Sequence, residues 1–215
     1  MAAVIERAEL HKTIWRIAND LRGSVDGWDF KSYVLGFLFY RFISENLTDY
    51  VNASERAAIL AEGGTPEEAA AFDYATLSDA DAEVVRDSIV KEKGFFIRPS
   101  DLFANVRARA ASDEDLNETL VRVFRFIENS ARGSGSESDL RGLFDDVDVN
   151  STKLGNTVAQ RNAKLVKIMD AVDDLPLEHG AAQIDAFGDA YEYLMTMYAS
   201  SAGKSGGEFY TPQEV

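Results

Sequence analysis

The feature that most constrains the fold of this chain is a largely apolar stretch near its N-terminus, FKSYVLGFLFYRFISENL at residues 30–47. Its apolar side chains surround nearly the whole circumference of a helix, which is the pattern of a helix buried on all sides. Asp29 is the candidate N-cap. The run from Tyr33 to Tyr40 is far shorter than the roughly 20 residues that cross a bilayer, and Arg41 follows it directly. We therefore expect a buried helix at the centre of the core.

Three further segments have apolar residues at the spacing of an amphipathic helix, at 6–21, 115–131 and 184–198. Another helix is expected from Thr157 to Val172. The last of the three periodic segments has the most regular spacing in the chain. In the second, the apolar side consists of Leu116, Leu120, Val123, Phe124 and Ile127.

Shorter elements are expected between the helix at 30–47 and the helix at 115–131. Residues 52–75 are rich in Ala and Glu and contain GGTP at 63–66, which predicts two short helices separated by a turn. Residues 79–91 predict one more helix. Gly36 lowers the helix propensity of the central helix, and we expect it to mark the close approach of another backbone.

Three connections lack a helical period. Pro99 disfavours helix at the preceding residue and predicts an extended path or turn, with Ser100 or Asp101 as its cap. The small polar residues at 132–139 are the candidate for a mobile loop. Residues 143–156 predict an ordered but irregular connection.

These patterns predict an all-α fold, a multi-helix bundle domain with an extended C-terminal tail. We find no internal repeat and no series of alternating strands, and 215 residues suffice for one substantial core. Hydrophobic residues make up 46% and charged residues 27%, as in ordinary globular proteins.

Composition narrows the classes of function. The chain has no cysteine and two histidines, so it offers neither disulfides nor a thiolate or histidine-rich metal site. The acidic run DDVD at 145–148 lacks the ligand pattern of a calcium loop, and we assign no metal site to it. The N-terminal residues lack the apolar core of a secretory signal, so we expect a cytoplasmic protein that binds no membrane.

The charge of the chain argues against DNA binding by its surface as a whole. Its formal net charge is -15, and DNA affinity depends largely on neutralising phosphates. A local basic face remains possible on the helix at 115–131, where Arg122, Arg125 and Arg132 lie near one another. These arginines either contact DNA or form an ordinary solvated face.

The C-terminal sequence GKSGGEFYTP is rich in glycine but does not fit a phosphate-binding loop. Such a loop needs Gly, four residues, and then Gly-Lys-Ser or Gly-Lys-Thr, whereas here most glycines follow Lys204. The residues alone therefore indicate a linker with an aromatic pair. On this basis the chain is a freestanding helical interaction module without an enzymatic role, and no catalytic residue is assigned.

Four stretches in order resemble the N-terminal region of HsdM-type modification subunits of type I restriction-modification systems. They are LRGSVDGWDFKSYVLGFLFYRFISENL, GFFIRPSDLF, RGLFDDVDVNSTKLG and DAFGDAYEYLMTMYASSAGKSGGEFYTPQEV. The last is the most specific, because an apolar helix followed by GK-GGEFYTP resembles the junction between that family's helical domain and its methyltransferase domain.

The resemblance implies a parent enzyme that methylates adenine at N6 with S-adenosylmethionine, on a base that leaves the duplex stack. It also implies a complex of two modification subunits and one DNA-specificity subunit, which contacts double-stranded DNA and to which a restriction subunit adds cleavage. The helical domain would help to enclose DNA and to assemble with the specificity subunit.

By the same resemblance, the residues that lie against the cofactor are Glu208, Phe209, Tyr210, Thr211, Pro212 and Gln213. The aromatic pair can cover apolar cofactor surface, the threonine can donate a hydrogen bond, and the proline fixes an extended path. The alternative is that this segment only packs the joint between the two domains.

The resemblance divides the chain into a helical domain at 1–202 and, at 203–215, a linker with the start of the cofactor-binding segment. The family's glycine-rich cofactor loop and its Asn-Pro-Pro-aromatic motif do not occur in the 215 residues. We therefore expect the chain to be part of a longer subunit whose methyltransferase domain is missing here, and to be inactive alone.

Overall fold

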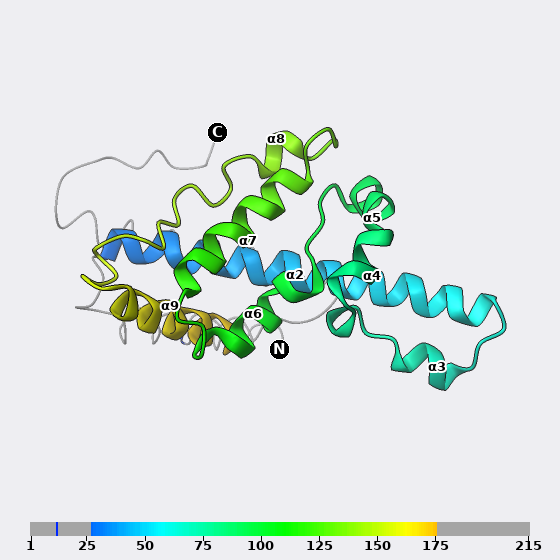
Figure 1. Cartoon of the computed structure of the whole chain (residues 1–215). Coiled ribbons are helices and arrows are strands. Elements are labelled where there is room, and N and C mark those ends of the chain that lie inside the picture. Colours follow the sequence, from blue (N-terminus) through cyan, green and yellow to red (C-terminus); the bar gives the residue numbers. More distant parts are fainter. Residues whose placement is uncertain (1–11, 13–26, 176–215) are drawn as a thin grey trace.

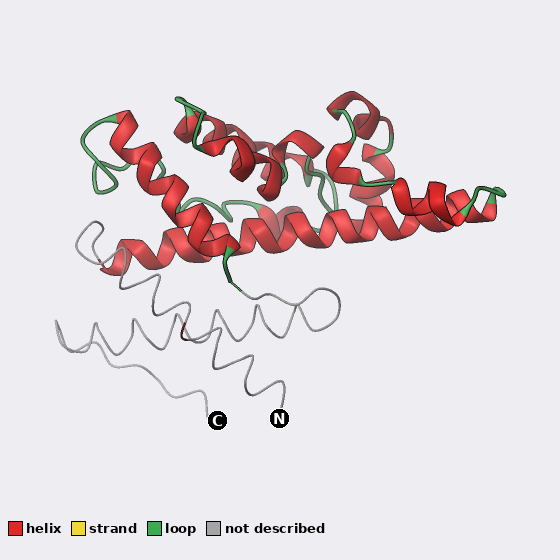
Figure 2. Ribbon diagram, turned by 90° about the horizontal axis from the view of Figure 1, so that it is seen from below, coloured by secondary structure: helices red, strands yellow, loops and turns green. Residues whose placement is uncertain are grey.

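The computed structural model describes Lys12 and residues 27–175, and among these residues all regular structure is helical (Figure 2). The predicted all-α class is thereby confirmed. The helices expected at 6–21 and 184–198, and the tail at 203–215, lie outside the described residues. None of the helices in the described ranges combines the length and apolarity needed to cross a membrane.

The predicted central helix is confirmed as α2, Gly27–Ala61, which extends across the molecule in Figure 1. Helices α3 (Pro66–Ala71), α6 (Phe103–Ala110) and α9 (Val158–Asp173) pack against it. Figure 1 shows α3 beside the C-terminal end of α2 and α9 nearer its N-terminal end. The most deeply buried side chains of α2 are Phe37, Leu38, Tyr40 and Leu47.

The ends of α2 differ from the prediction. The helix begins at Gly27, so Asp29 lies within it, and its assignment as the N-cap was wrong. The helix also continues to Ala61, so the first short helix expected within 52–75 is the end of α2. The predicted turn follows, and Thr65 then begins α3 with a capping box in which its side chain and that of Glu68 each accept the other's backbone N–H.

In the middle of the chain, one predicted helix is divided into two, and a short 3-10 turn follows them. The segment at 79–91 forms α4 (Asp79–Val84) and α5 (Arg86–Lys93), which meet at Val85. Pro99 begins a 3-10 turn, η2 (Pro99–Asp101), that contains Ser100 and Asp101 instead of being capped by either. A hydrogen bond connects this turn to α4, because Asp79 Oδ1 accepts the backbone N–H of Ser100 at 2.9 Å.

The remaining connections largely follow the sequence. The expected loop at 132–139 contains the start of α8 (Glu137–Leu140), and residues 143–156 form turns without a regular helix. Gly36 does mark a close approach, but the neighbour is the side chain of Val147 and not a backbone, since a Cβ at Gly36 would collide with it.

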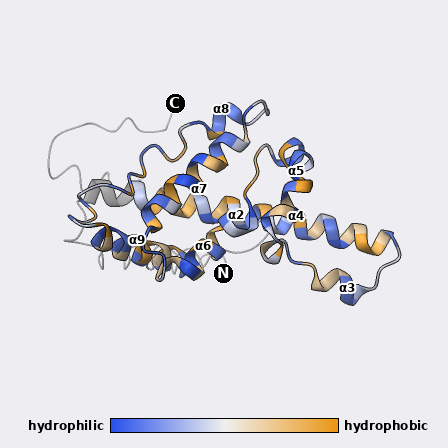
Figure 3. Ribbon diagram, viewed as in Figure 1, coloured by the Kyte–Doolittle hydropathy of each residue, from blue (hydrophilic) through white to orange (hydrophobic). Residues whose placement is uncertain are grey.

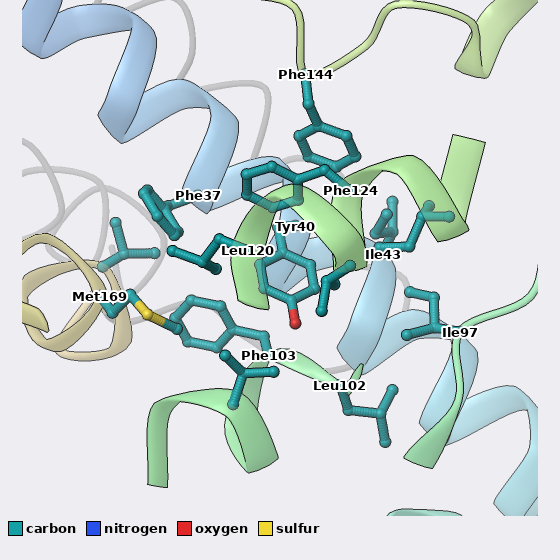
Figure 4. Close-up of a cluster of buried hydrophobic side chains, with 14 of the residues drawn as sticks. Phe37, Tyr40, Ile43, Ile97, Leu102, Phe103, Leu120, Phe124, Phe144 and Met169 are labelled. Atoms are coloured by element: carbon teal, nitrogen blue, oxygen red, sulfur yellow. The ribbon is translucent and has the colours of Figure 1, made fainter. Parts of the chain in front are cut away.

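The core is centred on aromatic residues brought together by α2, α7 (Leu116–Ser130) and the irregular connection (Figure 4). Phe124 of α7 stacks on Phe144 with ring centroids 4.2 Å apart. It also makes edge contacts with Phe37 at 6.0 Å and Tyr40 at 5.5 Å. Phe124 thus joins three segments that are far apart in sequence.

The N-termini of α6 and α7 are capped by side chains from other helices. Their own N-cap residues, Leu102 and Asp115, make no side-chain cap hydrogen bond. Instead, Ser44 Oγ of α2 accepts the N–H of Phe103 at 3.1 Å, and Asn162 Oδ1 of α9 accepts the N–H of Asn117 at 3.2 Å. Each interaction satisfies a backbone donor that the helix itself leaves unpaired.

The C-terminal end of α9 is capped in a similar way by Arg41 of α2. Its Nη1 donates to the carbonyl oxygens of Val172, Asp173 and Leu175 at 2.7, 3.0 and 2.9 Å. Its Nε donates to Glu45 at 2.6 Å, so the buried guanidinium is also paired with a carboxylate. A cation at the negative end of the helix dipole is favourable, and here it fixes that end to α2.

Candidate nucleic-acid interface

Helix α7 separates its apolar and basic residues onto two sides. The predicted apolar stripe is confirmed as buried, and it consists of Leu116, Leu120, Val123, Phe124 and Ile127. Arg122 and Arg125 are exposed, and Figure 3 shows hydrophilic and hydrophobic residues alternating along this helix. Because Arg122, Arg125 and Phe126 are three or four residues apart, they share one helix face.

A buried carboxylate lies next to Arg122. The Asp101 side chain is only 2% exposed, and its Oδ1 lies 3.8 Å from Arg122 Nη2 while its Oδ2 lies 3.9 Å from Arg98 Nη1. These distances allow ion pairing but are too long for hydrogen bonds. Oδ1 has no hydrogen-bond partner among the described residues. Asp101 therefore attracts two guanidinium groups without occupying their N–H donors.

Phe126 orients the second of these arginines. The guanidinium of Arg98 lies 3.8 Å from the centroid of the Phe126 ring, and that of Arg86 lies 5.6 Å from it. Cations at such distances are attracted by the face of an aromatic ring. We call Arg86, Arg98, Arg122 and Arg125 the arginine cluster.

The arginine cluster lies in a stretch of the sequence that is less acidic than the chain as a whole. Residues 86–136 contain nine lysines and arginines against eight acidic residues, although the whole chain carries -15. The same stretch lines a cleft of about 560 Å³ between α5 and residues 132–136. Its lining contains Lys91, Lys93 and Arg132 together with two acidic residues. Basic and acidic side chains are thus nearly balanced in this stretch, whereas the chain as a whole is strongly acidic.

Burial determines the ionisation of the polar groups beneath the cluster. Burial raises the pKa of Asp101 above its ordinary value, against the opposing effect of Arg122 and Arg98. Burial, followed by the charge of Asp101, also raises the pKa of Tyr40. The Tyr40 hydroxyl therefore stays protonated at neutral pH and donates to the backbone carbonyl of Asp101 at 2.5 Å.

The raised pKa of Asp101 predicts a pH-dependent cost. Because its pKa in the folded chain exceeds the unfolded value of about 3.9, folding favours the protonated form. That contribution to stability is complete below the unfolded pKa and is lost as pH rises through the folded pKa. The variant D101N, whose side-chain amide has no titratable proton, should gain free energy of unfolding relative to the parent chain as pH rises from 4 to 8. Urea unfolding across this range measures the difference, and a constant difference would contradict the prediction.

The sequence identified only part of this interface. Arg122 and Arg125 lie on one exposed face as expected, and Arg132 is exposed just beyond the end of α7. Arg86 and Arg98 were missed, because other segments bring them to α7. The sequence did contain one indication for Arg98. A residue directly before a proline is disfavoured in a helix, so Arg98 was expected in an extended segment or turn.

The sequence also raised an acidic run and a cofactor-binding segment for consideration. The carboxylates of DDVD at 145–148 are exposed, and the described residues contain no group of three acidic or histidine side chains that could hold a metal ion. The cofactor segment Glu208, Phe209, Tyr210, Thr211, Pro212 and Gln213 lies outside the described residues. The arginine cluster is therefore the site that the described part of the chain provides.

Comparison with known protein families shows that the chain belongs to one of them. The family described as HsdM N-terminal domain matches residues 10–172, and a second, described as N-6 DNA Methylase, matches residues 182–215. The resemblance noted in the sequence is thereby confirmed.

Two relatives are similar over nearly the whole chain. The type I restriction enzyme MpnII methylase subunit of Mycoplasma pneumoniae is 48% identical over 219 residues, which cover 98% of this chain and 38% of that protein. The crystal structure of the type I restriction-modification system methyltransferase subunit from Streptococcus thermophilus has a TM-score of 0.72 at 30% identity, covering 96% of this chain and 41% of the other. The chain thus spans about two fifths of the length of these relatives.

Proposed function

We propose that this chain is the N-terminal helical arm of the modification subunit of a type I restriction-modification system, a DNA adenine-N6 methyltransferase that uses S-adenosylmethionine. The observation that carries the proposal is the order of the two family matches, HsdM N-terminal domain at 10–172 followed directly by N-6 DNA Methylase at 182–215. A freestanding interaction module does not account for the second match. The arm extends to residue 202, and residues 203–215 begin the cofactor-binding segment.

The partners follow from this assignment. They are a DNA-specificity subunit, a second modification subunit, a restriction subunit and double-stranded DNA, in the cytoplasm. The acidic surface outside the arginine cluster suits contacts with protein better than contacts with DNA. The activity is tested by incubating the complete modification and specificity subunits with DNA and S-adenosylmethionine, and digesting the DNA to nucleosides. N6-methyladenine is the expected product, and its absence or a methylated cytosine would contradict the proposal.

The segment Glu208, Phe209, Tyr210, Thr211, Pro212 and Gln213 contributes one wall of the cofactor site. In the complete subunit, replacing Phe209 and Tyr210 together by alanine should raise the Kd of S-adenosylmethionine at least about tenfold, because two aromatic faces no longer cover apolar cofactor surface. Isothermal titration calorimetry measures this Kd. The control is K167E, a change at an exposed residue of α9, which should not change the Kd. An unchanged Kd in the double variant would mean that the segment only packs the joint between domains.

Arg122 and Arg125 contact DNA phosphates when the arm encloses the duplex. Reversing both charges, R122E with R125E, should reduce the slope of log affinity against log salt concentration by about 2, since each phosphate contact contributes about 0.9. Fluorescence anisotropy of a labelled duplex with the assembled methylase measures this slope. K167E, a charge reversal on another helix, is the matched control. An unchanged slope in the double variant would assign the two arginines to a solvated face.

A further inference from the structure

Arg98 reaches the arginine cluster from the segment before η2, and three features of its surroundings determine where its guanidinium lies. The ring of Phe126 lies beneath it at 3.8 Å, and the buried carboxylate of Asp101 lies 3.9 Å from its Nη1. The same carboxylate lies 3.8 Å from Arg122 on α7. Two guanidinium groups from separate segments therefore converge on one buried anion.

We infer that Arg98 and Arg122 jointly bind one phosphate group of the nucleic-acid backbone, and that Asp101 and Phe126 are positioning residues for this pair. The inference rests on the proposed function, because it adds a second segment of the chain to the DNA contact assigned there to α7. It differs from that function in the residues it needs, since Arg98 lies outside α7.

Charge and geometry favour a phosphate at this position. Two guanidinium groups near one carboxylate leave one net positive charge, and the 3.8 and 3.9 Å separations leave their N–H donors to other acceptors. The side chains of Arg98 and Arg122 are 33% and 60% exposed, so both reach solvent. Planar guanidinium forks match the oxygens of a phosphate, and the Phe126 ring holds one of them close to its face before the phosphate binds.

Asp101 explains why the pair can exist before the phosphate arrives. Two guanidinium groups would repel each other in the absence of DNA, and the carboxylate between them offsets that repulsion. Its side chain is 2% exposed, so the field it exerts is screened little by solvent. The burial that raises the pKa of Asp101 is the cost of this arrangement.

The test uses the assembled full-length methylase and two labelled duplexes, one containing its recognition site and one unrelated. Affinity is measured by anisotropy between 50 and 300 mM KCl for R98Q, R98K, R122Q, R125Q and R98Q with R122Q. Because one phosphate is shared, the R98Q and R122Q pair should reduce the salt slope by about 0.9 and not about 1.8, which lowers affinity roughly eightfold at 0.1 M salt on both duplexes. R98K keeps the charge and should keep the slope. R141Q is the control, because Arg141 is an exposed arginine that pairs with Glu137 and not with Asp101.

Other outcomes overturn the inference and separate it from the proposed function. If R122Q and R125Q reduce the slope but R98Q does not, α7 alone contacts DNA and the shared phosphate is wrong. If none of the variants changes the slope, the DNA contact of α7 is wrong as well. If R98Q and R122Q weaken assembly with the specificity subunit at an unchanged slope, the pair binds an acidic protein surface. Circular dichroism of each variant identifies any that fails to fold. If the double variant does not fold, the salt slopes of R98K and R98Q are compared, and equal slopes would contradict the inference.

Discussion

The variant R41L is expected to lose about 3–5 kcal/mol of the free energy of unfolding, the range in which removal of one partner from a buried charged network falls. Leucine fills much of the space but donates no hydrogen bond. The carbonyls of Val172, Asp173 and Leu175 then lose their shared donor, and the Glu45 carboxylate loses its cation. Urea unfolding followed by circular dichroism measures the change.

The matched control is R141L. Arg141 also pairs with a glutamate four residues away, at the same 2.6 Å as the pair of Arg41 and Glu45, but its side chain is 75% exposed where that of Arg41 is 8% exposed. The control should unfold with the parent chain, because an exposed ion pair adds little to stability. Equal losses in both variants would show that the contacts of Arg41 with α9 contribute nothing beyond its ion pair.

The variant F124A should also be costly, by about 3–5 kcal/mol, as is typical when a buried aromatic side chain is truncated to alanine. It removes the ring that stacks on Phe144 and meets Phe37 and Tyr40 edge to face. F124L should lose about half as much, since leucine retains apolar volume but not the ring contacts. The control L60A, at a side chain 49% exposed, should change stability by less than about 0.5 kcal/mol. Thermal and urea unfolding of all three variants measures the order, and a loss in F124A no larger than in L60A would contradict it.

Elements with a local signal were predicted well from the sequence. The apolar circumference of α2 and the apolar stripe of α7 both reflect burial that repeats at the helical period. Helix α9 begins within one residue of its prediction because Thr157 and Gln160 form a capping box that the sequence itself contains. Such features depend on neighbours along the chain and need no knowledge of the fold.

The misses depend on residues distant in sequence. Helix α6 was not predicted because its start is capped by Ser44, 59 residues away, while its own N-cap position is Leu102. The expected helix end before residue 52 was wrong because α2 continues where its later residues pack against α3. A local reading cannot supply partners that only the tertiary structure brings close.

The candidate site divides in the same way. Arg122 and Arg125 share a helix face, so their proximity follows from their spacing alone. The contribution of Arg98 depends on η2 placing Asp101 near Arg122 and on Phe126 lying beside Arg98, and both are consequences of the fold. Charge counts along the chain do not identify which arginines converge, because acidic residues are interspersed among them.

Caps supplied by distant helices make the two helix ends conditional on the rest of the domain. The first turn of α6 keeps its hydrogen bond only while Ser44 of α2 is in place, and that of α7 only while Asn162 of α9 is. Fraying of either start in the native state therefore breaks a hydrogen bond between helices. The segment from α6 to α7 carries Arg122 and Arg125, and we expect it to open together with the helices that cap it, so these two arginines should keep their positions for as long as the bundle is folded.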